Sequence, residues 1–341
     1  MPSGTRALPS IRTRLVSTLT VFGLVTLVVG LAAPLVGSTS LTWSRVFDQS
    51  LPFSDNVDAQ IFFIARLPRV LSAALVGAML AAAGVVFQAL LRNPLATPFT
   101  LGVSAGAALG AMLAITFGLQ VTLWGLPSVP IASFLGALGA VAIVYAMAQA
   151  RHRGFSTTVL LLAGVTLNSF FSALILFVQY SADFDQTFRT VRWLMGDLDV
   201  GSYGPILAVL PFTAVSFAAF ALLPRSLNVL TLGPEAALAR GIDAARTQRL
   251  AFFSASLATG AAVSLGGPVG FIGIVVPHLV RLLVGSDHRL VLPASALFGA
   301  AFLILCDVGS RTLMAPLEIP VGVVTALIGG PFFLWLLVRR S

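Results

Sequence analysis

The chain has 341 residues, of which 57% are hydrophobic and only 9% are charged. A soluble protein of this length needs far more charge to cover its surface, so the composition excludes a soluble enzyme or a soluble nucleic-acid-binding domain. The apolar runs are long enough for membrane-spanning helices of about 20 residues and do not alternate as barrel strands would, which predicts an all-α polytopic membrane protein.

Ten apolar segments follow one another along the chain, separated by polar or acidic stretches. The first follows a basic N-terminus, as a cleaved signal peptide would, but its apolar run is long for one. The pattern predicts one domain, residues 1–341, of about ten transmembrane helices. Their expected ranges are 15–36, 70–91, 100–118, 129–150, 157–180, 203–223, 250–265, 269–284, 290–304 and 321–338, with a short helix near 188–194 on the outer surface.

The basic residues indicate the orientation of this bundle. All 20 are arginine, and with an internal N-terminus 14 of them fall on the inner side and 6 on the outer side. Because arginine and lysine are retained in cytoplasmic loops, we expect both termini in the cytoplasm. The absence of lysine also excludes an ordinary P-loop, whose lysine binds the phosphates of ATP. Any ATP-driven motor must therefore be a separate chain.

The remaining chemistry-bearing residues predict no bound cofactor or metal. The lone Cys306 excludes an internal disulfide, and the three histidines are scattered along the chain. A membrane enzyme would need a polar catalytic cluster at membrane depth, and the sequence shows none. We therefore expect a protein that catalyses no reaction itself. A lone histidine such as His278 is seldom a metal ligand, so we expect a packing or hydrogen-bonding role for it.

The longest polar interruption is the stretch 224–249, which the charge pattern places in the cytoplasm. Within it, Gly233, Pro234 and Glu235 are typical of a helix start, and Gly241 is typical of a helix end. The predicted helix is too short to cross a bilayer. Its apolar residues are mostly alanine, which makes a poor anchor on a lipid surface. The stretch therefore predicts a surface helix that binds another protein.

Small residues recur every four positions in two of the predicted helices. They are Gly102, Gly106 and Gly110 in one, and Ala73, Gly77 and Ala81 in the other. Such spacing lets membrane helices approach closely, and we favour this packing role over contact with a substrate.

Several motifs, taken in order, resemble those of one known family. They are Arg66-Leu-Pro-Arg69, the run from Gln88 to Pro98 followed by LGVSAGA at 101–107, the run GPVGFIGIVVPHLVR at 267–281, GSDHR at 285–289, Asp307 to Arg311, PLEIPVG at 316–322 and, in the cytoplasmic loop, Leu238-Ala-Arg-Gly241. The ordered set resembles the FecCD-type permeases, the membrane subunits of type II ABC importers for ferric siderophores, haem and vitamin B12. The resemblance covers about residues 66–340. At 306–311 the sequence departs from the family's usual residues, which affects packing only.

The resemblance implies the type II ABC importer permease fold and a set of partners. A second permease subunit, identical or a close paralogue, would complete a dimer in the bacterial inner membrane. Two cytoplasmic ATPase subunits would use the ATP, and a soluble extracytoplasmic protein would deliver the cargo. A ferric siderophore is the most frequent cargo in the family, while haem and cobalamin remain open. The alternative class, an ion-coupled secondary transporter, would need paired intramembrane carboxylates, and every Asp and Glu falls at or beyond a predicted helix end.

The resemblance also assigns roles at the two surfaces of the membrane. In the cytoplasmic loop it implies a coupling helix seated in a cleft of the ATPase, with Glu235, Leu238, Ala239, Arg240 and Gly241 at the contact. On the outer side it implies that Arg66, Arg69 and Arg311 meet acidic residues of the docked binding protein. The alternative for these arginines is snorkelling from a helix end to water.

Polar residues on and near the predicted helix 157–180 are candidates for the translocation path. Thr157 and Thr158 form a cytoplasmic gate by resemblance, and helix capping is compatible with that role. Asn168 must face a neighbouring helix or the path, and interhelical hydrogen bonding is the simpler interpretation. Gln88 is interpreted as structural. For Asp307, four positions before Arg311, we expect a local ion pair.

Overall fold

The computed structural model describes residues 10–48, 50–119, 127–151 and 156–339, and every regular element within these ranges is a helix. Seven helical segments of this described part are long and apolar enough to cross a membrane. Three shorter apolar helices accompany them, which confirms the predicted all-α bundle of about ten spans.

The bounds of these helices agree well with the apolar runs. The long spans are α1 (Ile11–Ala32), α4 (Leu67–Leu90) preceded by α3 (Val57–Gln60) and a π-helical turn (Ile61–Arg66), α6 (Ser128–Arg151), α7 (Thr157–Tyr180), α9 (Gly204–Leu222), α12 (Ala244–Gly266) and α14 (His288–Thr312). The shorter apolar helices are α5 (Val103–Thr116), α13 (Ile272–Val284) and α15 (Val321–Arg339). Four polar or short helices lie between spans: α2 (Trp43–Val46), α8 (Phe184–Leu194), α10 (Pro224–Leu230) and α11 (Pro234–Ala239).

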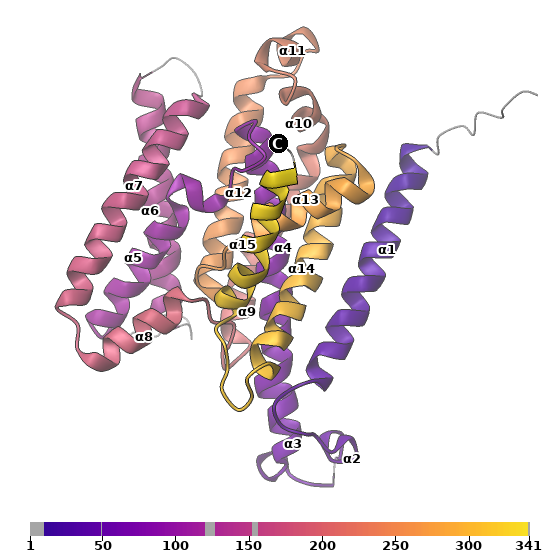
Figure 1. Ribbon diagram of the computed structural model, residues 1–341, viewed down its shortest axis with the longest axis vertical. Coiled ribbons are helices and arrows are strands. Elements are labelled where there is room, and N and C mark those ends of the chain that lie inside the picture. The colour runs from indigo at the N-terminus through magenta and orange to yellow at the C-terminus, as the bar shows by residue number, and fades with distance from the viewer. Residues whose placement is uncertain (1–9, 49, 120–126, 152–155, 340–341) are drawn as a thin grey trace, which may run out of the picture.

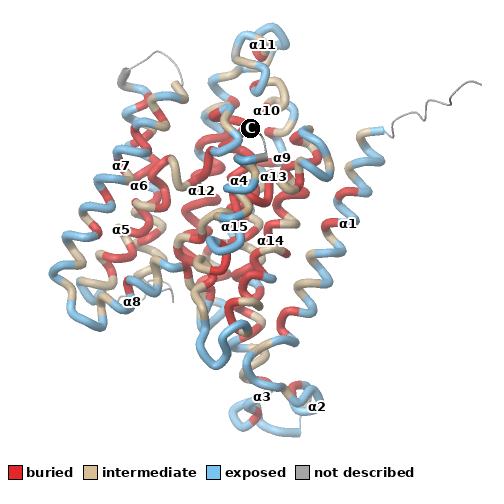
Figure 2. The backbone as a smooth tube through the Cα atoms, viewed as in Figure 1, coloured by how far each residue is buried: buried red, intermediate tan, exposed pale blue. Residues whose placement is uncertain are grey.

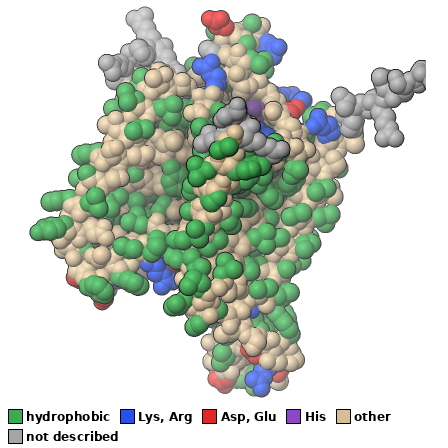
Figure 3. All heavy atoms as spheres, viewed as in Figure 1, with side chains coloured by type: hydrophobic (Ala, Val, Ile, Leu, Met, Phe, Trp, Pro, Cys, Tyr) green, Lys and Arg blue, Asp and Glu red, His purple; other side chains and the backbone are tan. Residues whose placement is uncertain are grey.

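The two ends of the bundle differ in what they carry. Helices α10 and α11 lie at one end, which we call the α11 end, and α2 and α3 lie at the opposite end, which we call the α3 end (Figure 1). On the face that Figure 3 shows, apolar side chains are spread along the length of the bundle, and charged side chains gather mainly toward its ends. An apolar flank between two polar ends is the surface that a bilayer requires.

Helix α4 forms the centre of the bundle, between α12 and α14. All of its residues from 79 to 90 are buried, as the red core of Figure 2 shows. Its glycines allow close contact: a Cβ on Gly77 would lie 2.2 Å from the Gly299 carbonyl oxygen, and one on Gly84 would lie 2.2 Å from that of Gly273. Backbones that approach this closely gain dispersion contacts, which are a main source of helix association in lipid.

The second set of spaced small residues packs α5 against α6. A Cβ on Gly106 would lie 2.5 Å from the Gly136 carbonyl oxygen, and one on Gly110 would lie 2.1 Å from that of Ala132. These contacts confirm the packing role predicted for both helices. Gly102 differs, because its φ of +78° places it in the left-handed turn before α5.

Three expected boundaries were wrong, each where a helix continues through charged residues. The second span begins at Val57 rather than at 70, α12 begins at Ala244 rather than at 250, and α14 ends at Thr312 rather than at 304. The predicted boundaries lie where an apolar run meets its first charged residue. A helix can continue past that residue, because it needs only backbone hydrogen bonds and a cap at its end. The Asp243 side chain supplies that cap for α12 by accepting from the Arg246 N–H at 2.9 Å.

The predicted break at 266–268 is present between α12 and α13. Gly267 has a φ of +66°, and a Cβ there would lie 2.6 Å from the Trp193 carbonyl oxygen. The Asp197 N–H donates to the Gly266 carbonyl oxygen at 3.0 Å. The break therefore lies against the segment that follows α8, and it directs α13 back into the bundle.

Candidate functional site

The capped helix predicted in the stretch 224–249 is α11. Its start is Gly233, with a φ of +115°, followed by Pro234 in the first turn. Its end is closed by two backbone hydrogen bonds, from the Gly241 N–H to the Leu238 carbonyl at 3.0 Å and from the Ile242 N–H to the Ala237 carbonyl at 2.9 Å. This closure satisfies carbonyls that the end of a helix would otherwise leave unpaired.

All five residues expected at the coupling contact lie together on the surface of α11. Leu238 is 67% exposed, and the others are exposed as well: Glu235, Ala239, Arg240 and Gly241. Among the residues of α11 whose burial is described, Ala237 alone is fully buried. The closed turn after α11 thus leaves a large apolar side chain, that of Leu238, exposed at the surface.

Helix α10, which the sequence analysis did not predict, attaches α11 to the bundle. Leu227 and Leu230 are buried, and the Asn228 amide joins α10 to the start of α14. Its Nδ2 donates to Asp287 Oδ1 at 2.7 Å, and its Oδ1 accepts from the His288 N–H at 2.9 Å. The apolar spacing of Leu223, Leu227 and Leu230 could have indicated this helix.

Asp287 binds both Asn228 of α10 and the guanidinium of Arg289. Arg289 contacts its carboxylate at 2.6–3.1 Å. These hydrogen bonds from Arg289, followed by that from Asn228, hold the pKa of Asp287 below its usual range, although partial burial opposes them. The carboxylate is thus ionised and bonded at neutral pH.

The three arginines expected at the docking surface converge at the α3 end, and all three are buried. Arg66 is 5% exposed, Arg69 is 8% exposed and Arg311 is 5% exposed. Arg69 Nε contacts Asp307 Oδ1 at 2.7 Å, and Arg311 Nε contacts Asp307 Oδ2 at 3.0 Å. The local pair predicted between Asp307 and Arg311 is confirmed, and Arg69 extends it across 238 positions of sequence. We call these residues, with Glu318, the arginine cluster.

Asp307 corrects the expectation that every acidic residue lies at or beyond a helix end. Asp307 lies within α14, because that helix continues for about two turns beyond its predicted end. Its side chain is fully buried. Two arginines share its carboxylate, and a buried charge is tolerated only when it is paired in this way. Both oxygens of the Asp307 carboxylate are therefore already in contact with arginine side chains of the same chain.

Glu318 and Arg66 complete the cluster at its surface. Arg69 Nη1 contacts Glu318 Oε2 at 2.7 Å, and the Glu318 side chain is 44% exposed. Arg66 uses backbone carbonyls instead: its guanidinium donates to Pro34 O at 3.0 Å and also to the carbonyl of Thr39. A cavity of about 150 Å³ lies beside these side chains, and its lining includes Arg66, Arg69, Arg311 and Glu318.

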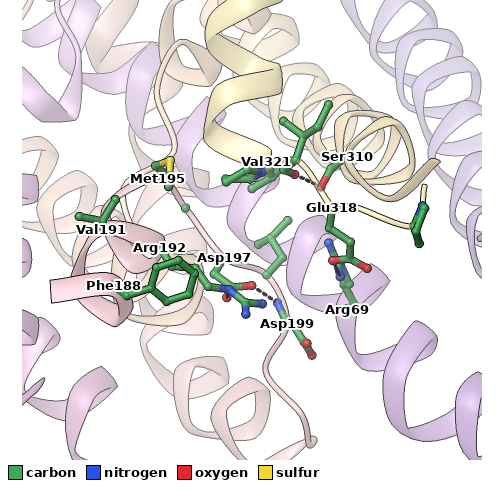
Figure 4. A pocket seen from close by; sticks show the side chains of 15 residues that line it. Arg69, Phe188, Val191, Arg192, Met195, Asp197, Asp199, Ser310, Glu318 and Val321 are labelled. Carbon is green, nitrogen blue, oxygen red and sulfur yellow. Dashed lines mark hydrogen bonds and ion pairs between the residues drawn. The ribbon is translucent and has the colours of Figure 1, made fainter. Parts of the chain in front are cut away.

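A larger cavity of about 640 Å³ opens beside the cluster, between α8 and the segment that leads into α15 (Figure 4). Arg69 and Glu318 point toward one another on one side of it, and Arg192 and Asp197 lie on the other. Arg192 Nε contacts Asp197 Oδ2 at 3.0 Å. This cavity could not be predicted from the sequence, because its walls come from segments more than 100 positions apart. The predicted short outer helix near 188–194 is α8 and forms one wall.

The three path candidates lie along α7, away from both groups. Ser156, rather than either threonine, caps α7 by accepting from the Val159 N–H at 3.4 Å, so the capping alternative for Thr157 and Thr158 was wrong. Thr157 is half-buried and Thr158 is exposed. Asn168 Nδ2 donates to the Phe99 carbonyl oxygen at 2.7 Å, which confirms an interhelical hydrogen bond.

Two further polar residues have structural contacts at the α11 end. Gln88 is buried and bonds α13 twice, donating to the Gly273 carbonyl at 2.9 Å and accepting from Arg281 Nη1 at 2.5 Å. His278 packs edge-on against the Phe332 ring, with centroids 6.2 Å apart. These contacts agree with the structural roles expected for both. Within the described ranges, His, Cys, Asp and Glu form no group of three that could hold a metal ion.

The bundle of about ten spans thus carries an exposed capped helix at one end and a buried ion-pair cluster at the other. The chain belongs to the FecCD transport family, whose sequence pattern matches residues 24–339. Proteins of this family are transport permeases rather than catalytic enzymes. Membership of an ABC transporter permease family implies association with ATPase and binding-protein partners.

Relatives of several cargo types are similar over most of the chain. The cobalamin import permease of Halobacterium salinarum is 42% identical over 318 residues, covering 91% of this chain and 83% of the relative. The hemin transport permease of Yersinia pestis is 36% identical over 315 residues, covering 92% of each. A probable siderophore transport permease of Bacillus subtilis is 34% identical over 314 residues, covering 91% of this chain and 92% of the relative.

A solved structure confirms the fold. It is described as an inward-facing conformation of a metal-chelate type ABC transporter. The TM-score is 0.79 at 33% sequence identity, and the match covers 96% of this chain and 100% of the other. The predicted type II importer permease fold is therefore confirmed.

Proposed function

We propose that this chain is the permease subunit of an ATP-driven importer that carries a ferric siderophore across the bacterial inner membrane. The observation that carries the proposal is α11, a short helix with a closed C-terminal turn that holds Leu238 exposed at one end of a membrane bundle. ATP would be used by two separate subunits, since this chain lacks the lysine of a P-loop. A second permease chain, identical or a close paralogue, would complete the path.

The coupling step uses the surface of α11. Leu238 and Ala239 would pack into a cleft of the ATPase, while Glu235 and Arg240 would make polar contacts at its rim. Gly241, at a φ of +70°, sets the direction in which the chain leaves the contact. Because α10 is joined to α14 through Asn228, a displacement of α11 would be transmitted to a long transmembrane helix. This transmission requires the ATPase to bind the two states of the permease with different free energies.

The opposite end would receive the cargo-loaded binding protein. The 150 Å³ cavity and the 640 Å³ cavity adjoin each other, because Arg69 and Glu318 line both. An acidic group of the binding protein would meet Arg66, Arg69 and Arg311 there. Since the three arginine side chains are buried, docking would have to engage them from the side of the partly exposed Glu318. Both chain termini would then lie in the cytoplasm with α11.

The path would run along α7. Thr157 and Thr158 begin this helix at the α11 end, where they would narrow the path and act as the cytoplasmic gate. Asn168 would line the path further along the same helix, with its Nδ2 hydrogen-bonded to the Phe99 carbonyl oxygen.

Cobalamin is the second candidate cargo, because the relative at 42% identity is a cobalamin import permease. The test is uptake into proteoliposomes that contain the complete transporter, supplied with its binding protein and loaded in parallel with a ferric siderophore, haem or cobalamin. We expect ATP-dependent accumulation of the siderophore and none without the ATPase. Accumulation of cobalamin alone would reassign the cargo. Uptake driven by an ion gradient without any ATPase would overturn the importer class.

A further inference from the structure

A basic pocket of about 470 Å³ lies at the α11 end, between the end of α4, the end of α13 and the start of α14. Its cationic and imidazole groups come from three different segments. Polar hydrogen-bonding groups surround them, and the lining includes Arg92, Arg281, His278, His288, Asn93, Thr231 and Ser286. None of the described residues that line it is acidic. The pocket is separate from the α11 contact surface and from the arginine cluster.

Arg281 is a half-buried cation that lacks a carboxylate partner among the described residues. Its Nη1 donates to the neutral amide oxygen of Gln88 at 2.5 Å. The neighbouring carboxylate, Asp287, already binds Arg289 and Asn228. A guanidinium removed from water normally has an anion beside it, as Arg69 has in the arginine cluster. Arg281 therefore has capacity for an external anion.

Arg92 is a second arginine in the lining of the pocket. Its φ of +49° is rare for a residue other than glycine, and it turns the chain sharply at the end of α4. The side chain is exposed and has no ion-pair partner within the described ranges. Such uncommon backbone conformations persist where the surroundings impose them, often at binding sites.

The surface next to the pocket indicates which kind of anion fits. Leu282, which also lines the pocket, is 66% exposed, and the adjacent Leu283 is 71% exposed. Both lie in the last turn of α13, an apolar helix of the bundle. Two arginines beside exposed leucines match a ligand that has an anionic group and an acyl chain. Free phosphate would use only the first of these features.

We propose that this pocket binds the phosphate headgroup of an anionic phospholipid, with Arg92 and Arg281 on the phosphate and Leu282 and Leu283 along the acyl chain. Arginine matches phosphate oxygens with paired N–H donors, and basic pockets between helices at the cytoplasmic surface suit anionic headgroups. The site goes beyond the transport role, and it does not depend on which cargo is carried.

The test is native mass spectrometry of the full-length permease, in the assembly in which it is purified, titrated with phosphatidylglycerol. The variant Arg92→Gln with Arg281→Gln should bind the lipid about 30-fold more weakly, because each arginine near a membrane surface contributes about 1 kcal/mol. Arg281→Lys should retain most of the affinity lost in Arg281→Gln. The matched control is Arg12→Gln with Arg246→Gln, which removes the same charge from exposed positions outside the pocket and should leave the affinity unchanged within about two-fold.

Equal loss in both double variants would overturn the proposal, because it would show general attraction to a basic surface. Displacement of the lipid by millimolar inorganic phosphate would instead identify a free-phosphate site. Loss of a partner subunit from the assembly, with lipid binding intact, would show that the pocket is a protein contact. Arg92→Gln alone removes an exposed side chain, so a measurable loss in this variant tests the site even if the double variant fails to fold.

Discussion

The two ends of this bundle use charge in opposite ways. At the α3 end, three arginines are buried and share two carboxylates and several backbone carbonyls. At the α11 end, Glu235 and Arg240 of α11 are exposed, and they make no ion pair with described residues. The first arrangement holds helices together, and the second leaves groups available to a partner. Arginines that look equivalent in the sequence therefore differ in burial and in their ion-pair partners.

The largest expected effect comes from removing the carboxylate that the arginine cluster shares. Asp307→Ala would leave Arg69 and Arg311 buried without their common partner, and breaking a buried pair in this way costs about 3–5 kcal/mol. We expect a large loss of folded protein, measured as the midpoint of thermal unfolding in detergent. Glu318→Ala is the control, since its side chain is 44% exposed and its loss should cost about 1 kcal/mol or less. Equal effects of the two variants would show that Asp307 does not organise the cluster.

The next effect tests whether the exposed end is a coupling surface. Leu238→Ser with Arg240→Ala should lower ATP-driven uptake by about 30-fold, because an apolar anchor at the centre of a contact is worth about 2 kcal/mol. ATP hydrolysis should continue, and the fold should be unaffected, because both residues are exposed.

The control for α11 is Leu232→Ser, which removes a side chain that is 64% exposed in the same polar segment but outside the helix. This variant should transport normally. Normal uptake by the α11 double variant would refute the coupling assignment.

A smaller effect is expected at the docking surface. Arg66→Gln removes the one arginine of the cluster that lacks a carboxylate partner among the described residues, so it changes the charge without breaking an internal ion pair. We expect binding-protein affinity to fall by about five-fold, mainly through slower association, as measured by surface plasmon resonance. Arg189→Gln, on the exposed surface of α8, is the control. Unchanged docking by Arg66→Gln would leave Arg66 as a structural residue.

The smallest effect concerns pH and the attachment of α10. The folded-state pKa of Asp287 is lowered by Arg289 and Asn228, so the stability it contributes is present above its unfolded pKa of about 4 and is lost as the pH falls below that value. Hydrogen exchange of the α10 amides should therefore be constant from neutral pH to about pH 5 after correction for intrinsic rates. Asp287→Asn should raise their exchange modestly at neutral pH. Faster exchange already near pH 6 would contradict this assignment.

The sequence by itself determined the class of the protein and most of its helices. Long apolar runs have few alternatives to membrane helices, because lipid offers no partner for unpaired backbone groups. The capped helix in 224–249 was also predictable, since glycine and proline act through local backbone geometry. The order of the motifs then identified the family.

Only the tertiary structure decided how the charged residues are paired. Asp307 lies far from Arg69 in the chain, and the sequence could not show that α4 and α14 bring them within 2.7 Å. The same limit applied to Asn228, Asp287 and Arg281, whose surroundings come from separate helices. Local sequence determines where a helix can form, whereas the environment of a buried charge depends on which distant helices pack beside it.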